Sequence, residues 1–155
     1  MHDITLLELF NDDIGSAEQL LALIDDEFQA LGERDLARLQ SILEKKQPLL
    51  AQLDQHGRAR SQLLLGLQLS ADRAGLQVLA ERSSQGTALL ERGDQLHRLL
   101  ERCQAANLRN GRLIRSSQAS TSSMLGILRG GETPNLYDSR GSTARIGQQR
   151  PLSQA

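Results

Sequence analysis

The feature that most constrains this chain is the spacing of its apolar residues, which recur every three or four positions. Over residues 4–31 they stand at Leu7, Phe10, Ile14, Ala17, Leu21, Ile24, Phe28 and Leu31. Such spacing places apolar side chains on one face of an α-helix and is typical of coiled-coil-like packing. A β-sheet has little to be built from, because aromatic residues make up 2% of the chain and Val78 is its single valine. We therefore expect an all-α protein.

The same spacing predicts two further long helices, over about 34–65 and about 87–128. Between them, a serine followed by apolar residues predicts a short helix over about 71–82. Pro48 lies inside the second long helix, where it lacks a backbone donor and clashes with the preceding turn. A kink or a short break is expected just before it. With a first helix over about 3–31, the expected fold is an antiparallel bundle of three long helices and one short helix.

The bundle should end near residue 129. The remaining segment, 130–155, is rich in Gly, Ser, Gln and Arg and contains few large apolar residues. Ordering the backbone costs about 1–2 kcal/mol per residue, and this segment cannot bury enough apolar surface to offset that cost. We therefore expect one helical domain, residues 1–129, followed by a flexible tail.

Charge is distributed unevenly, although the net charge is only −1. Residues 1–33 contain nine acidic residues and no Lys or Arg, whereas the segment from Cys103 onward has seven Arg and two acidic residues. The expected exposed face of the first helix carries Asp12, Asp13, Glu18, Asp25, Asp26 and Glu27. Nucleic acid binding is disfavoured because the arginines lack Lys and aromatic neighbours other than Tyr137. We favour a match between these arginines and acidic surface, on this chain or on a partner.

Catalysis and metal binding need several reactive side chains in one place. The three histidines are scattered singly, so we expect each to be a solvated residue, and the lone Cys103 to be a small apolar filler. We expect no enzyme activity, cofactor or metal. The N-terminus has no basic region typical of a secretory signal, and no apolar run approaches the ~20 residues of a membrane span. These observations favour a cytoplasmic protein without stable membrane insertion.

The last predicted helix changes character along its length, because polar residues such as Asn107 take the seam positions in its second half. Asn110 and Gly111 are a common hairpin dipeptide, yet helical spacing resumes after them without a shift. We therefore expect Gly111 to lie within the helix at a close contact, although the pattern leaves open whether the helix is continuous there. The apolar residues that follow are Leu113, Ile114, Met124, Leu125, Ile127 and Leu128.

Three stretches of the last third carry a resemblance to a known family. They are NLRNGRLI at residues 107–114, MLGILRG at 124–130 and LYDSRG at 136–141. An N-x-x-N-G-x-L-I stretch followed by a Y-D-x-x-G tail resembles the FlgN-type flagellar export chaperones. The two motifs occur in the family's order, and the length and acidic first helix agree with it in general terms.

The resemblance implies a cytoplasmic chaperone that holds the hook–filament junction proteins, prevents their premature assembly or degradation, and delivers them to the cytoplasmic domain of the type III export gate. It also implies contact with the general export component. The implied client-binding residues are Asn107, Asn110, Gly111, Leu113, Ile114, Met124, Leu125, Ile127 and Leu128. The implied residues for docking at the gate are Tyr137, Asp138 and Gly141. From the seams alone, a structural coiled-coil subunit forming a constitutive oligomer is the alternative, and the oligomeric state stays open.

Overall fold

The computed structural model describes residues 1–128, which form four helices. These are α1 (His2–Glu33), α2 (Leu36–Gly66), α3 (Arg73–Glu81) and α4 (Gly86–Leu128). No strand occurs within this part of the chain. The prediction of an all-α fold with three long helices and one short helix is therefore confirmed. The expected tail lies outside the described residues.

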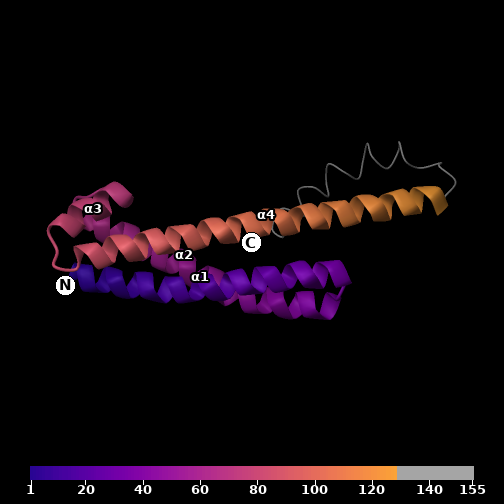
Figure 1. The fold of residues 1–155 in the computed structure, drawn as a ribbon, viewed down its shortest axis with the longest axis horizontal. Helices are drawn as coiled ribbons and strands as arrows, with labels where there is room; N and C mark the ends of the chain where they lie inside the picture. The colour runs from indigo at the N-terminus through magenta and orange to yellow at the C-terminus, as the bar shows by residue number, and fades with distance from the viewer. Residues whose placement is uncertain (129–155) are drawn as a thin grey trace.

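Helix α1 packs against both α2 and α4 (Figure 1). Along the α1–α2 contact, Asp13 binds Arg60 while Glu27 binds Lys46. The partner on α2 thus moves backward as the residue on α1 moves forward, which is the pattern of antiparallel helices. Consecutive long helices are antiparallel, as predicted.

Helix α2 returns the chain to the end of the bundle where α1 begins, and α3 lies at that end, so that α4 runs parallel to α1 (Figure 1). The thiol of Cys103 donates a weak hydrogen bond to the carbonyl oxygen of Ala17 at 3.6 Å. The side chain of Asn110 donates to the carbonyl oxygen of Ile24. Both pairs are 86 positions apart in sequence, and a constant offset of this kind belongs to parallel helices.

A two-residue turn joins α1 to α2. Arg34 adopts the left-handed conformation (φ 56°), and its backbone N–H bonds back to the carbonyl oxygens of Ala30 and Leu31. The carboxylate of Asp35 then caps α2 by accepting a hydrogen bond from the backbone N–H of Arg38 at 3.1 Å. So short a connection forces the two helices to lie antiparallel and fixes which of their residues meet.

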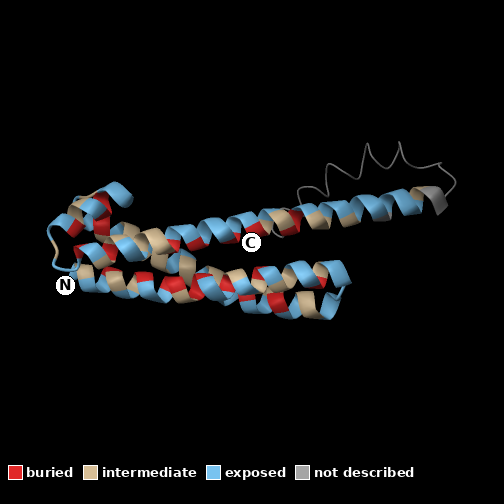
Figure 2. Cartoon of the chain, viewed as in Figure 1, coloured by how far each residue is buried: buried red, intermediate tan, exposed pale blue. Residues whose placement is uncertain are grey.

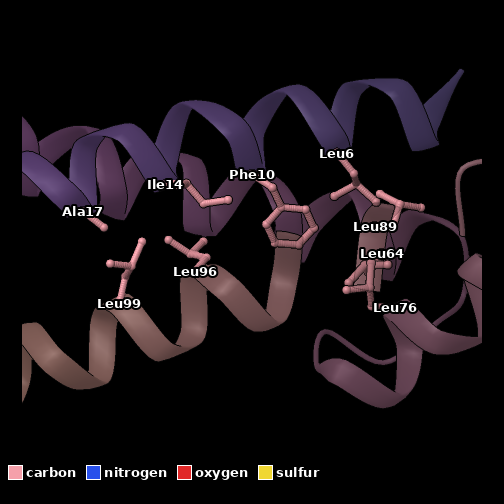
Figure 3. Close-up of a cluster of buried hydrophobic side chains, with 9 residues drawn as sticks. All are labelled: Leu6, Phe10, Ile14, Ala17, Leu64, Leu76, Leu89, Leu96 and Leu99. Carbon is pink, nitrogen blue, oxygen red and sulfur yellow. The ribbon is translucent and has the colours of Figure 1, made fainter. Parts of the chain in front are cut away.

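The apolar seams meet in two clusters of buried residues (Figure 2). The larger cluster comprises Leu6, Phe10, Ile14, Ala17, Leu64, Leu76, Leu89, Leu96 and Leu99 (Figure 3). The smaller one comprises Leu20, Ile24, Cys103 and Ala106. Burying one Leu, Ile or Phe side chain contributes about 1.5–3 kcal/mol, so these clusters are the main source of stability. The expected role of Cys103 as an apolar filler is confirmed.

Helix α2 is continuous through Pro48, so the short break considered for this position does not occur. Proline removes the N–H that would bond the carbonyl of Glu44. Both residues are exposed, and water can satisfy the free carbonyl. Leu49 and Leu50, on the following turn, pack against the smaller cluster and hold this part of α2 in place.

At the contact between α1 and α2, the expectations for Asp13 and His56 are wrong. Asp13 does not lie on the exposed face of α1, because its side chain is fully buried and accepts a hydrogen bond from Arg60. His56 is not solvated, since it is half-buried and its Nδ1 lies 2.8 Å from the Asp13 carboxylate. The facing turns of α2 supply two polar partners, which compensate the carboxylate for its lost hydration. The Arg60 guanidinium also lies over the Phe10 ring, 5.2 Å from its centroid.

Candidate interaction site on the last helix

Helix α4 changes its environment at Gly111. The helix is continuous through this residue, which is buried, so the hairpin alternative is excluded. The part before it packs along α1 and buries Leu89, Leu96, Leu99, Cys103 and Ala106. Helix α4 has 43 residues and α1 has 32, and both start at the same end of the bundle. The last part of α4 therefore extends past the turn between α1 and α2 (Figure 1).

A buried polar cluster marks the end of the packed part of α4. The side chain of Asn110 is 2% exposed, and its amide nitrogen donates to the carbonyl oxygen of Ile24 and to Oε1 of Glu27, both at 2.8 Å. The other carboxylate oxygen of Glu27 accepts a hydrogen bond from the Lys46 ammonium at 3.3 Å. We call Ile24, Glu27, Lys46 and Asn110 the Asn110 cluster. It joins α1, α2 and α4.

The charges of this cluster compensate one another. Lys46 has a side chain only 1% exposed, and an ammonium buried this deeply costs several kcal/mol unless it is paired. Glu27 supplies the opposite charge, and the Asn110 amide holds its carboxylate in place. Glu27 was expected on the exposed face of α1, but its side chain is only 16% exposed. The seam between α1 and α4 thus ends in a directional contact.

Arg109 extends this contact at the surface. Its guanidinium donates to the carboxylate of Asp25 at 3.0 Å and to the side-chain oxygen of Asn110 at 3.2 Å. It also lies over the ring of Phe28, 4.1 Å from the centroid. Attraction between a cation and a ring face contributes about 0.5–1 kcal/mol at exposed sites. At this position the expected match between an arginine of α4 and acidic surface is confirmed within the chain.

Beyond Gly111 the helix has little cover, and we call residues 112–128 the free end of α4. Its exposed or partly exposed apolar residues include Leu113, Ile114, Met124 and Leu125. Leu113 shares a face with Met124 eleven residues later, because eleven residues make three helical turns plus about 20°. Ile114 and Leu125 repeat the same relation. The free end therefore carries two apolar pairs on one side.

The structure places some of the predicted client-binding residues inside the bundle and others on the exposed surface of the free end. Asn110 and Gly111 are buried in the bundle and Asn107 is half-buried, so the first two serve the packing of α4 on α1. Met124 and Leu125 of the free end are 63% and 42% exposed. The predicted site residues that lie outside the description of side chains are Ile127, Leu128, Tyr137, Asp138 and Gly141.

The other polar groups of residues 1–128 are engaged within the fold or exposed singly. In this part of the chain, no three His, Cys, Asp or Glu side chains are grouped as a metal site requires, and no helix has the length and apolarity to cross a membrane. His97 is exposed and lies 2.8 Å from Glu101. Burial raises the pKa of the Cys103 thiol, which keeps it protonated at neutral pH.

Sequence reasoning misses the pairing of Lys46 with Glu27. A signal was present, because Lys46 occupies a position where the seam of α2 otherwise carries leucine. A charge at such a position requires a buried partner. Which of the acidic residues of α1 faces it depends on the register that the turn at Arg34 imposes, and that register is not visible in the spacing of apolar residues.

Comparisons with known proteins agree with the motifs of the last third. The family model described as FlgN protein matches residues 1–145. A crystal structure of a flagella synthesis protein FlgN from Pseudomonas aeruginosa is 56% identical in sequence and matches with a TM-score of 0.69. The match covers 80% of this chain and 95% of that chain. No curated protein matches. Because the family model spans nearly the whole sequence, this chain belongs to the FlgN family.

Proposed function

We propose that this chain is a cytoplasmic flagellar export chaperone that binds hook–filament junction proteins, prevents their premature assembly or degradation, and delivers them to the type III export gate. Membership of the FlgN family supports the flagellar role. The single structural observation that supports client binding is the free end of α4, which carries apolar side chains beyond the bundle.

An apolar stripe on a projecting helix is suited to packing against a helix of a client. The two apolar pairs, at 113–114 and 124–125, are separated by roughly 16 Å along the axis, with a serine-rich stretch between them. Burial of each apolar side chain contributes about 1.5–3 kcal/mol, and ordering of a mobile client segment costs about 2–5 kcal/mol. The balance gives a moderate affinity, which suits a client that has to be released at the gate.

Docking at the gate rests on the sequence motif. Tyr137, Asp138 and Gly141 match the Y-D-x-x-G tail, and tyrosine is a common anchor of protein interfaces. We assign these residues to contact with the cytoplasmic domain of the export gate. The general export component is proposed as a further partner.

A double substitution in the free end tests client binding. Met124→Ser combined with Leu125→Ser should weaken the affinity for a purified hook–filament junction protein by about tenfold or more, as measured by calorimetry. Tenfold corresponds to about 1.4 kcal/mol, less than the burial of one such side chain provides. The matched control is Leu65→Ser, which changes a leucine 59% exposed at the end of α2 and should alter the affinity by less than about twofold. Unchanged client affinity in a helical double variant would refute client binding by the free end.

The same assay separates client binding from docking. Tyr137→Ala should bind the client as the wild type does and lose binding to the purified gate domain. If gate binding persists, the docking role of Tyr137 is wrong and the client proposal stands. The alternative, a constitutive coiled-coil oligomer that seals the apolar free end, predicts instead a melting temperature that rises with protein concentration.

A further inference from the structure

The seam between α1 and α4 opens towards the end of α1. The constant offset between these parallel helices places the last turns of α1 level with residues 114–119 of α4. Ile24 is fully buried, whereas Phe28, one turn later on the same side, is 37% exposed even though the Arg109 guanidinium lies over its ring. Gly32, a further turn along, is exposed, and a Cβ atom there would meet nothing within 4 Å. Beyond Ile24 the two helices therefore leave space between them.

The apolar side chains at the end of α4 lie on the side of this space. Asn110 marks the side of α4 that faces α1, because its amide binds a backbone carbonyl of that helix. Around the helix axis, Met124 lies about 40° to one side of Asn110 and Leu125 about 60° to the other. Glu33, the last residue of α1, is level with Ala119, and Met124 stands roughly 8 Å beyond it. Whatever covers these two side chains lies directly beyond the last turn of α1, and we call Phe28, Gly32, Met124 and Leu125 the open end of the seam.

The charges of the free end indicate the sign of its partner. Residues 102–128 contain four Arg and no acidic residue. Arg112 and Arg115 lie on the free end, are exposed, and have no ion pair within the part of the chain that the structure describes. They lie on the side of α4 away from the open end, so they act on a partner there through their field and not through contact. An acidic partner is therefore favoured.

Charge and shape disfavour the other occupants of the open end. Residues 129–155 contain four Arg and two acidic residues, and the free end of a second copy is as basic as this one, so both meet like charge. A membrane surface does not fit, because the end of α1 stands on the side to which Met124 and Leu125 point and a flat surface cannot pass it (Figure 1). A slender segment, such as a single helix, can follow the line of α1.

We propose that the client contributes an acidic amphipathic helix that seats in the open end of the seam, in line with α1. Its first apolar residues enter the space beside Gly32, and its next turn covers Met124 and Leu125. A helix suits this place because its backbone groups are satisfied internally when it lies on an apolar surface. Gly32 is thereby a client contact on α1, where the missing side chain lets the client approach. This role of Gly32 rests on the client binding proposed for the free end and adds a second wall to that surface.

Filling the space beside Gly32 tests the place of the client. Gly32→Trp should lower the affinity of the full chain for a purified hook–filament junction protein about tenfold or more, as measured by calorimetry. Gly15→Trp is the matched control, because an added Cβ there also meets nothing within 4 Å and the position lies roughly 25 Å away along α1. It should change the affinity less than about twofold. Both variants should keep the helical circular dichroism signal, since glycine disfavours a helix interior.

Salt tests the acidic character of the client helix. Screening weakens an attraction between charges and leaves apolar contacts intact or stronger, so the affinity should fall about threefold or more between about 50 and about 500 mM NaCl. The double variant Arg112→Gln with Arg115→Gln should lose most of this dependence. Arg98→Gln with Arg102→Gln removes two exposed arginines from the packed part of α4 and should keep it.

Wild-type affinity in Gly32→Trp would overturn the proposal. If Met124→Ser with Leu125→Ser still loses the client in that case, client binding by the free end stands without the second wall on α1. If neither variant loses affinity, both proposals fall. An affinity that is unchanged or rises with salt would also overturn an acidic client helix. Self-association of the chain that Gly32→Trp weakens would assign the open end to a second copy and overturn it as well.

Discussion

Replacing Glu27 by Gln should destabilise the protein more than replacing Lys46 by Met, although both changes break the same ion pair. The Lys46 side chain is 1% exposed and that of Glu27 is 16% exposed. Glu27 uses both carboxylate oxygens, one for Asn110 and one for Lys46, and an amide has only one acceptor oxygen. Glu27→Gln therefore leaves a buried ammonium without a counter-charge. Removing one partner of a buried pair in this way costs about 3–5 kcal/mol.

Lys46→Met should cost about 1–2 kcal/mol. The methionine thioether fills nearly the same space, and the Glu27 carboxylate keeps its hydrogen bond from Asn110 and some contact with water. The free energy of unfolding is measured by urea denaturation followed by far-UV circular dichroism. A difference of about 2–3 kcal/mol between the variants corresponds to about 4–12 °C in melting temperature for a chain of this size.

The double variant Glu27→Gln with Lys46→Met is the decisive control. It removes the stranded ammonium, so it should be more stable than Glu27→Gln alone, which a double-mutant cycle expresses as a coupling energy. A Lys46→Met variant that is as unstable as Glu27→Gln would refute the reasoning, because the cost would then follow lost packing and not an uncompensated charge.

Two further predictions concern the start of α3 and the seam between α1 and α4. The side-chain hydrogen bonds that Asp72 receives from Ser70 and Asp94 from Arg73 hold the pKa of both carboxyls below its usual value. The stability that these two carboxylates contribute to the fold is complete above the unfolded pKa of about 3.9 and is lost as the pH falls through their lower folded pKa values. Below about pH 4, the backbone amides of α3 should therefore lose protection from hydrogen exchange before those of α1. Cys103, 3% exposed and with its pKa raised by burial, should react with a thiol reagent at least about a hundredfold more slowly than in urea. Asn110→Ala should accelerate that reaction by loosening α4 from α1, and native labelling as fast as in urea would show that the seam does not protect the thiol.

The fold could be predicted from local sequence because the spacing of apolar residues identifies the buried face of each long helix. Ile14, Ala17 and Ile24 lie on the predicted stripe of α1 and are buried. The stripe fails at Phe28, which is 37% exposed and serves as a platform for the Arg109 guanidinium. Periodicity identifies the side of a helix that faces the core, but it does not tell where along the helix the neighbour ceases to cover it.

The candidate site was predictable only in part, for the same physical reason. The apolar residues of the free end stand out in the sequence, and Met124 and Leu125 are exposed as a binding surface requires. Asn110 stands out equally, but its side-chain amide donates hydrogen bonds to the Ile24 carbonyl and the Glu27 carboxylate inside the bundle. It is therefore not free to bind a client. Polar residues at seam positions mark either a weak contact or a buried hydrogen-bonded one. A weak contact and a buried hydrogen-bonded contact differ in whether another helix supplies a hydrogen-bond partner. The sequence of one helix does not reveal that partner.

The Asn110 cluster also explains why α4 projects beyond the bundle from a fixed residue. Apolar seams are non-directional, and a slide of α4 along α1 by one turn, about 5.4 Å, would exchange one leucine contact for another at modest cost. The same slide would carry the Asn110 amide away from the Ile24 carbonyl and the Glu27 carboxylate, and leaving this buried amide without acceptors costs about 1–3 kcal/mol. A buried asparagine in a helical seam sets register in this way. The register of α4 on α1 then determines which residues emerge beyond the turn at Arg34, so that the polar contact fixes the position of the apolar pairs at 113–114 and 124–125.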